Sequence, residues 1–241
     1  MSSSQRTRNY NVFDPAQSTD DDARKRGYLA RNILPLIKVG LAEVTSKKNE
    51  LVVEVGPGKG LLQSMLKERG FASHAIEVCE AYADDLKKKG YPCELASNAA
   101  DALRKSATKG VGAIVAVDVL EHLPLEEGMF LLSAAADVLP RGGSLILQVP
   151  NVSGLFGIST FAADPTHLMP YNEHSLRKVL EAAGFVSIEL HPMKLPGSAT
   201  DALRSVCREV VFFLVRCLQR VVGATPCRIL THNIVARAVK A

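Results

Sequence analysis

Two stretches of the sequence bring together side chains that can accept or donate a proton. Asp118, Glu121 and His122 stand close along the chain, and His167 ends the turn sequence DPTH. A carboxylate can orient an imidazole for proton removal, so both stretches suit general acid–base chemistry. We predict His167 as the catalytic residue, with a loop-stabilising hydrogen bond as the alternative. For His122 we favour a structural role that braces the loop.

A third stretch, LVVEVGPGKG at residues 51 to 60, joins an apolar run to three glycines. Apolar β-branched residues that end at glycine predict a buried strand, and the spacing of LLQSMLKERG predicts a helix after the turn. Gly56, Gly58 and Gly60 would let the backbone take positive φ and let a ligand approach it closely. We therefore expect a nucleotide-like cofactor at this turn.

Glu54 narrows the choice of cofactor. The glycine spacing departs from the G-x-G-x-x-G pattern of dinucleotide sites. A buried carboxylate is costly unless it is paired, and it would repel a pyrophosphate but attract an ammonium group. We expect a cofactor with a positive amino group and no phosphate. The alternative for Glu54 is a salt bridge to the N-terminal helix through Arg31.

Four motifs together resemble those of class I S-adenosylmethionine-dependent methyltransferases of the small-molecule or glycan type. EVGPGKG is similar to the first motif of that family, VAVDVLEHLP to the fourth, LPRGGSLILQVPN to the helix end and fifth strand, and DPTHLMPYNEHSLRKVLEAAGF to a later segment. The resemblance covers roughly residues 25 to 190. It implies S-adenosyl-L-methionine as the cofactor.

The resemblance also implies which residues bind that cofactor. Glu77 corresponds to the acid that holds both ribose hydroxyls, because one carboxylate has two acceptor oxygens. The family often contacts the adenine with an aspartate after the third strand, and here Asn98 or Asp101 must serve. No metal ligand is predicted. The predicted cofactor-binding residues are Glu54, Gly56, Gly58, Gly60, Glu77, Asn98, Asp118 and Val119.

Methyl transfer to an oxygen of a small molecule, a sugar or a lipid-linked acceptor is the function that the resemblance implies. The sulfonium already makes the methyl group electrophilic, so the protein has mainly to align the nucleophile. A hydroxyl acceptor needs a general base, for which we predict His167, whereas a carboxylate or phenolate needs only positioning. The alternatives are a catalytically inactive scaffold of the same fold that still binds the cofactor, and a nicotinamide oxidoreductase.

Short apolar runs alternate with amphipathic stretches, which predicts an α/β fold: a doubly wound, mostly parallel seven-stranded sheet with helices on both faces. The predicted strands are LVVEV, HAIEV, YPCEL, VGAIVAVD, GGSLILQVP, FVSIELH and NIVARAV. No repeat or linker divides the chain, so we expect a single domain over residues 1–241. Its expected parts are a flexible segment (1–22), an N-terminal helix that Pro35 kinks (23–48), a cofactor-binding half (49–150) and a substrate-side half (151–241).

Composition argues against several classes of partner. The 241 residues carry a net charge of +4 with 5% aromatic residues and no Trp, so we expect no nucleic-acid partner. The N-terminal residues lack a hydrophobic segment, and we expect a cytoplasmic protein without a signal peptide or membrane anchor. Five cysteines without a C-x-x-C pair predict buried thiols rather than disulfides or zinc. Four further histidines have no partner at ligand spacing and are assigned no metal: His74, His174, His191 and His232.

Residues 201–222 are predicted to form an amphipathic helix. At about 100° per residue its polar side chains fall within an arc of about 160°, which Phe212 interrupts, and the rest of the wheel is mostly apolar. The arginines of the segment exclude a membrane-spanning helix. We predict that the apolar face is buried in a protein interface, against the sheet edge or in a homodimer, with peripheral membrane contact as the alternative.

Overall fold

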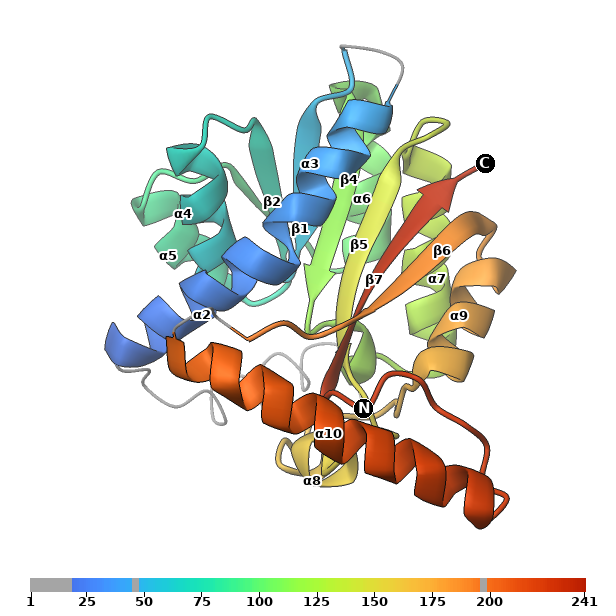
Figure 1. Cartoon of the computed structure of the whole chain (residues 1–241). Helices are drawn as coiled ribbons and strands as arrows, with labels where there is room; N and C mark the ends of the chain where they lie inside the picture. Colours follow the sequence, from blue (N-terminus) through green and yellow to red (C-terminus); the bar gives the residue numbers. More distant parts are fainter. Residues whose placement is uncertain (1–18, 45–47, 196–198) are drawn as a thin grey trace.

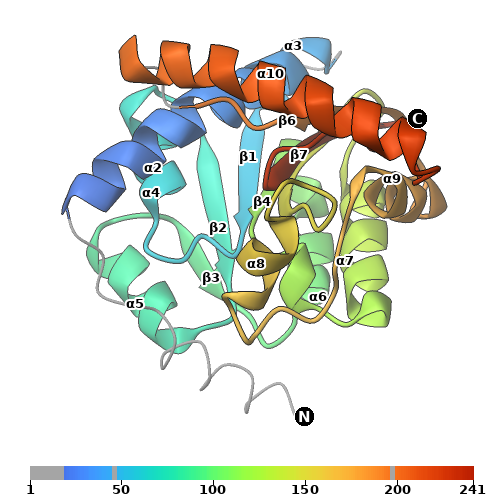
Figure 2. The same cartoon turned by 60° about the horizontal axis from the view of Figure 1, so that its bottom comes forward.

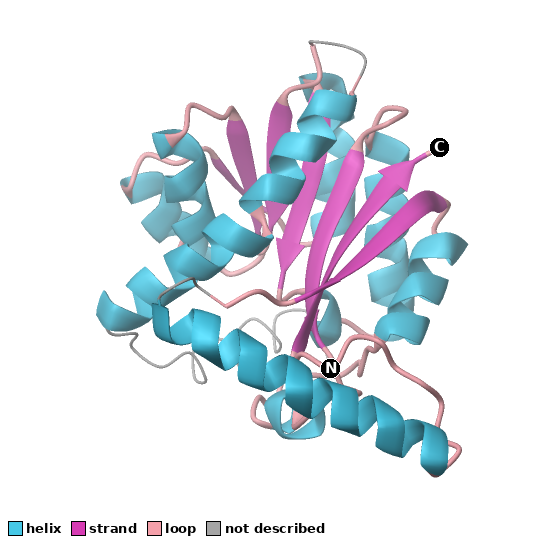
Figure 3. Ribbon diagram, viewed as in Figure 1, coloured by secondary structure: helices cyan, strands magenta, loops and turns pink. Residues whose placement is uncertain are grey.

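The computed structural model describes residues 19–44, 48–195 and 199–241, and a seven-stranded sheet forms its centre (Figures 1 and 3). The strand order is β3-β2-β1-β4-β5-β7-β6, and β7 runs antiparallel to both of its neighbours. The predicted doubly wound, mostly parallel sheet is therefore confirmed. Its strands are β1 (Leu51–Val55), β2 (Ser73–Glu77), β3 (Cys93–Leu95), β4 (Val111–Val117), β5 (Ser144–Pro150), β6 (Phe185–Pro192) and β7 (Asn233–Lys240).

Helices cover both faces of this sheet. One buried apolar cluster joins the sheet to α6, α7 and α9, and a second joins it to α2, α3 and α4. Short 3-10 helices follow α6 (η1, Ser106–Lys109) and β4 (η2, Leu120–His122). The α-helices are α2 (Thr19–Asn32), α3 (Leu34–Glu43), α4 (Leu61–Glu68), α5 (Glu80–Lys88), α6 (Ala99–Lys105), α7 (Leu125–Val138), α8 (Gly157–Ala162), α9 (Glu173–Ala182) and α10 (Ala199–Val221).

The direction of the strands gathers distant loops at one place. The five parallel strands β1 to β5 end at the same edge of the sheet, which faces the viewer in Figure 2. We call this the carboxyl edge and define it by the loops that begin at Gly56, Val78, Ala96, Asp118 and Asn151. Ligands of open α/β sheets bind in the crevice outside the carboxyl ends of the strands. The predicted cofactor-binding residues come from these loops or from the strand ends beside them, and His167 comes from the loop between α8 and α9.

The N-terminal segment forms two helices rather than the single helix predicted over 23–48. Helix α2 begins at Thr19, so residues 19–22 of the predicted flexible segment are helical, and the rest of that segment lies outside the described residues. Helix α3 begins at Leu34 and has Pro35 in its first turn. Proline has no N–H to donate to the preceding turn, so α2 ends before it and a new helix begins there.

Helix α10 packs with the opposite face from the one that we predicted. Eight of its apolar residues lie in solvent, with exposed fractions between 42% for Val211 and 83% for Val221. The polar arc faces the chain, where Phe212 is buried with Cys227 and Leu230. Burial of the apolar face against the sheet edge is therefore wrong. The exposed apolar residues of the helix are Leu203, Val206, Val210, Val211, Phe213, Leu214, Leu218 and Val221.

Polar contacts explain this orientation of α10. Arg208 donates a hydrogen bond from Nη1 to the Met193 carbonyl at 3.0 Å, in the segment after β6. In Figure 1 the helix runs across the carboxyl side of the sheet in front of α8, and Figure 2 shows α8 apart from it, nearer the middle of that edge. None of the helices in the described ranges combines the length and the hydropathy that a membrane span requires.

Candidate active site

The glycine turn after β1 is built by positive backbone angles. The φ angles of Gly56, Gly58 and Gly60 are +68°, +53° and +80°. A Cβ at Gly56 would lie 2.7 Å from a methyl group of Val119, and one at Gly60 would lie 2.3 Å from a methyl group of Leu86. At Gly58 the same added carbon would meet no atom within 4 Å. Packing thus requires glycine at two positions, whereas the third opens a space beside the backbone that suits a ligand.

Glu77 ends β2 beside this turn. Its Oε1 accepts hydrogen bonds from the backbone nitrogens of Val78 at 2.7 Å and Cys79 at 2.8 Å. Its Oε2 accepts one from the Gly58 nitrogen at 3.2 Å. Burial raises the pKa of Glu77, and these three donors act against that rise because they stabilise the charged form. The predicted ribose ligand therefore contacts the predicted cofactor turn directly.

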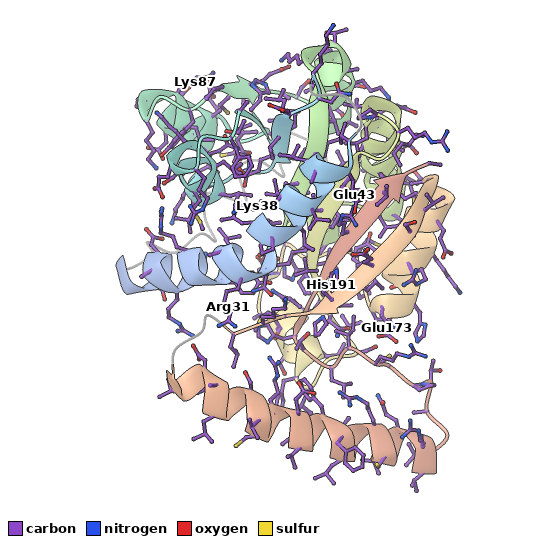
Figure 4. The ribbon with its side chains drawn as sticks, turned by 45° about the horizontal axis from the view of Figure 1, so that its top comes forward. Arg31, Lys38, Glu43, Lys87, Glu173 and His191 are labelled. Atoms are coloured by element: carbon purple, nitrogen blue, oxygen red, sulfur yellow. The ribbon has the colours of Figure 1, made fainter. Side chains whose placement is uncertain are left out.

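Glu54 is buried in β1 and has a different partner from the one that we considered. Gln63 of α4 donates a hydrogen bond to its Oε2 at 2.7 Å. Burial raises the pKa of Glu54 to about 7, and the charge of Glu77 adds to the rise while the Gln63 hydrogen bond lowers it. The alternative salt bridge to Arg31 is wrong, because Arg31 belongs to the last turn of α2 and lines a cavity with Asp201 and Ser205 of α10 (Figure 4).

Asp118 and Val119 follow β4, and the backbone turns sharply between strand and helix. Asp118 has a φ of +54°, a conformation that non-glycine residues rarely adopt and that often marks functional sites. Its Oδ1 accepts a hydrogen bond from Gln148 Nε2 at 2.8 Å, and Gln148 Oε1 accepts one from the Tyr28 hydroxyl. This chain of hydrogen bonds ties α2 to the ends of β4 and β5.

Sequence reasoning missed Tyr28 and Gln148 as parts of the site. Gln148 is 3% exposed and interrupts the apolar run of β5, and such a polar residue in a buried strand needs partners. That interruption was the signal that could have found it. Tyr28 carried no comparable signal, because a tyrosine on an amphipathic helix commonly packs as an apolar residue.

The two candidates for the adenine contact lie at the start of α6. Asn98 is the N-cap of that helix, and its Oδ1 accepts hydrogen bonds from the backbone nitrogens of Ala100 at 2.9 Å and Asp101 at 3.2 Å. Asp101 is exposed on the first turn and lies 3.9 Å from Arg104. Asn98 therefore has a capping role of its own, and the adenine contact stays a prediction.

His167 lies in the loop between α8 and α9 with its side chain 9% exposed. Its Nδ1 is 2.8 Å from the carbonyl oxygen of Phe161, and a carbonyl only accepts, so Nδ1 carries the proton and donates it. In the neutral ring Nε2 is then the basic nitrogen. It lies 3.8 Å from Asp164 Oδ2 and 4.0 Å from Glu121 Oε1.

Glu121 and His122 of η2 meet His167 across the carboxyl edge. The Glu121 side chain is 0% exposed, and within the described ranges neither carboxylate oxygen has a hydrogen-bond donor. Burial and the charge of Asp118 raise the pKa of Glu121. The backbone carbonyl of Glu121 accepts hydrogen bonds from Leu168 and Met169 at 2.8 and 3.0 Å. The loop that carries His167 is therefore held against η2.

His122 contacts the same loop through its ring. Thr166 Oγ1 donates its single proton to Asp164 Oδ1 at 2.6 Å, so it accepts a hydrogen bond from His122 Nδ1 at 2.9 Å. Burial lowers the pKa of His122 to about 4, so its ring is neutral near pH 7. The rings of His122 and His167 are 4.7 Å apart. His122 thus makes the contact that the predicted bracing role requires.

Comparisons with known proteins agree with this architecture. The family model of the methyltransferase domain matches residues 23–190. No curated protein matches the chain.

Solved structures share the fold at low sequence identity. An S-adenosylmethionine-dependent methyltransferase from Archaeoglobus fulgidus has a TM-score of 0.65 and 19% identity over 91% of this chain and 94% of its own. Magnesium protoporphyrin IX methyltransferase from Synechocystis PCC 6803, crystallised with S-adenosylmethionine, has a TM-score of 0.53 and 16% identity over 95% and 88% of the two chains. Human N-acetylserotonin methyltransferase has a TM-score of 0.52 and 11% identity over 85% of this chain and 51% of its own.

The family match covers more than half of the chain and spans the glycine turn, Glu77, Asp118 and His167. These residues are the ones that the structure gathers along the carboxyl edge. The chain therefore belongs to the methyltransferase-domain family, which confirms the predicted class I S-adenosylmethionine-dependent methyltransferase.

Proposed function

We propose that the protein transfers the methyl group of S-adenosyl-L-methionine to an oxygen of a small molecule, a sugar or a lipid-linked acceptor. The observation that carries this proposal is His167. Its Nδ1 donates to a carbonyl oxygen, so the basic Nε2 is directed to the carboxyl edge, near Glu121 and Asp164. A hydroxyl acceptor must lose a proton when it attacks, and a neutral imidazole at this place could take it.

The glycine turn and Glu77 would hold the cofactor. The open space at Gly58 and the carboxylate beside it fit a ligand with vicinal hydroxyls that approaches the backbone closely. Bound S-adenosyl-L-methionine supplies an electrophilic methyl group. The remaining task of the chain is to align the acceptor oxygen with that group and to exclude water. Asp118 and Val119 would border the cofactor from the next strand.

Cofactor binding and turnover can be tested in two steps. Isothermal titration of the full chain with S-adenosyl-L-methionine and with NAD should give saturable binding of the first only. Radiolabelled methyl transfer to cell-extract metabolites, resolved by mass spectrometry, should then identify products methylated on oxygen. Products methylated only on nitrogen or carbon would contradict the oxygen acceptor. Binding of NAD in place of S-adenosyl-L-methionine would favour the oxidoreductase.

An inactive scaffold of the same fold is the second candidate function. A scaffold that binds the cofactor would use the glycine turn and Glu77 as well, but the DVLEH segment, whose Glu121 lies 4.0 Å from His167, argues against it. Saturable cofactor binding without transfer to any acceptor in the extract would favour the scaffold.

We also propose that the exposed face of α10 contacts a lipid bilayer, and that the protein is otherwise cytoplasmic. Further apolar side chains are exposed at the start of α8, where Ile158 is 63% exposed and Phe156, the N-cap, is 75% exposed. Helix α8 is joined to the site loop by the hydrogen bond between Phe161 and His167. Arg204 of α10, whose side chain is 71% exposed, adds a positive charge that suits anionic lipids. A bilayer on this face would bring a lipid-linked acceptor to the carboxyl edge.

Vesicle sedimentation tests this contact. The protein should pellet with vesicles of phosphatidylcholine and phosphatidylglycerol, and the pair Val210→Asp with Leu214→Asp should prevent it. Val39→Asp, an exposed apolar position on α3, is the matched control and should still pellet. A dimer in analytical ultracentrifugation that ignores vesicles would replace the bilayer by a second copy. A monomer that ignores vesicles would contradict both.

A further inference from the structure

We propose that Glu121, His122 and His167 bind a divalent transition-metal cation. The three residues come from η2 and from the loop between α8 and α9, and one potential ligand atom of each lies within 4.8 Å of the other two. No metal ligand was predicted from the sequence, in which His167 is remote from the other two residues. The fold brings them together at the carboxyl edge.

The carboxylate of Glu121 is the strongest argument for a cation. It is fully buried, and within the described ranges neither oxygen receives a hydrogen bond. A buried charge without partners is costly, and in proteins such charges are paired or coordinate metals. A divalent cation would satisfy both oxygens with one ligand.

A second cluster of potential metal ligands differs from the first, because its carboxylate has hydrogen-bond donors. Glu173, His174 and Cys227 also offer ligand atoms within 4.8 Å of one another. There, however, the Glu173 carboxylate accepts hydrogen bonds from the backbone nitrogens of Arg228 at 3.0 Å and Ile229 at 2.9 Å. Glu173 lies at the start of α9 (Figure 4), and its role is to hold the chain after α10. It needs no cation, so the second cluster serves as a control.

The two imidazoles are oriented as metal ligands usually are. His167 Nδ1 donates to the Phe161 carbonyl, and His122 Nδ1 donates to Thr166, which in turn donates to Asp164. Metal-ligating histidines almost always donate their other ring N–H to a carbonyl, a carboxylate or a similar acceptor. In both neutral rings the lone pair is then on Nε2. In His167 this nitrogen is the one that lies 4.0 Å from Glu121 Oε1.

The donor set also indicates which cations fit. One carboxylate and two imidazoles suit Zn²⁺, Mn²⁺, Co²⁺ or Fe²⁺, whereas Mg²⁺ and Ca²⁺ prefer oxygen ligands. Ligands about 2.1 Å from a tetrahedral ion lie roughly 3.4 Å apart, so these side chains would close by about 1 Å. Three protein ligands leave at least one position for water or for the acceptor.

The cation would act on the acceptor oxygen, and this role rests on the proposed function. A metal-bound hydroxyl has a lowered pKa and releases its proton to water, after which the oxygen can form a bond to the methyl carbon while the carbon–sulfur bond breaks. His167 would then act as a ligand instead of taking the proton itself. The two roles of His167 can be distinguished with a chelator. Methyl transfer should stop on chelation if His167 is a metal ligand, and should continue if His167 is a base that acts without metal.

Metal binding can be measured without turnover. The full chain, stripped with a chelator and titrated with Co²⁺, should bind one equivalent and develop the visible absorption of a nitrogen- and oxygen-ligated ion. Glu121→Gln and His167→Gln should each weaken binding at least about 100-fold. His174→Gln, from the second cluster, should bind as the wild type does. Thermal unfolding should show Glu121→Gln folded, because the substitution removes a buried charge.

The outcomes separate this inference from the proposed function. Absence of stoichiometric binding of Co²⁺, Zn²⁺ and Mn²⁺, or binding that Glu121→Gln leaves intact, would overturn the metal site. Methyl transfer that survives chelation would overturn its catalytic role while the proposed function stands. A wild-type protein that binds the metal, together with a Glu121→Gln variant that does not, would support the site. If that wild-type protein transfers no methyl group to any oxygen, the result would count against the proposed function.

Discussion

Glu77 and Glu121 are two buried carboxylates at the same edge of one sheet, with exposed fractions of 4% and 0%. Glu77 accepts hydrogen bonds from three backbone nitrogens, whereas the carboxylate of Glu121 receives none from the described residues. Backbone donors keep a carboxylate charged in the absence of a ligand, but a carboxylate without donors depends on a proton or a cation. In the proposed site, the cofactor end around Glu77 is therefore complete within the chain, whereas the acceptor end around Glu121 is completed by the proton or cation that binds there.

The largest expected effect is at the cofactor end. Gly58→Val should abolish measurable binding of S-adenosyl-L-methionine, because the branched side chain would fill the open space beside the turn. Calorimetry gives the affinity. Gly184→Val is the matched control, since Gly184 also has positive φ and open surroundings but lies in the turn before β6. A folded Gly58→Val protein that binds normally would remove the turn from the site.

At the acceptor end, His167→Ala should reduce turnover by about 100-fold or more and change the cofactor Kd less than about threefold. The physical reason is that, in the proposed function, His167 faces the acceptor while Glu77 and Gly58 face the cofactor. Steady-state kinetics measure the turnover, and calorimetry on the same preparation measures the cofactor Kd. Equal losses in both quantities would mean that the two ends are not independent, and His174→Ala should change neither.

Glu77→Ala should weaken cofactor binding by about 1.5 to 3 kcal/mol, the range for hydrogen bonds to charged groups. The substitution also leaves three backbone donors without their acceptor, so Glu77→Gln, which keeps an oxygen, should lose less. Unchanged affinity in both folded variants would show that Glu77 only closes the turn. The difference between Glu77 and Glu121 would then be structural, without a role for Glu77 in cofactor binding.

The smallest effect concerns Glu54. Burial raises the pKa of its carboxyl group to about 7 from an ordinary 4.5, so the folded state retains a proton that the unfolded state releases. The free energy of unfolding of the wild type should therefore fall, relative to Glu54→Gln, by about 1 kcal/mol between pH 6 and pH 8. Urea titrations at the two pH values measure it. Parallel pH profiles would show that Glu54 keeps its ordinary pKa.

Much of the fold could be predicted because buried strands appear in the sequence as short runs of apolar residues. The seven apolar runs match β1 to β7 closely, and parallel order places the glycine turn beside Glu77 without further information. The break at Ile33 was harder to place, because proline is compatible with either a kink or a new helix.

The acceptor end could be predicted only in part. His167 was found from its turn sequence, but its approach to Glu121 depends on the path of a loop with no regular periodicity. The inward face of α10 was missed for another reason. A helical wheel identifies the apolar side but does not say which side the rest of the chain covers, and Phe212 with Arg208 decided that contact.

The outward apolar face of α10 has a consequence for the protein in solution. A folded chain that displays a row of Val, Leu and Phe side chains over about five turns of helix is surface-active, because any apolar phase removes that row from water. It should adsorb at the air–water interface and on hydrophobic resins more strongly in sulfate than in chloride. Dilute preparations should lose protein to plastic, and a mild detergent should recover it.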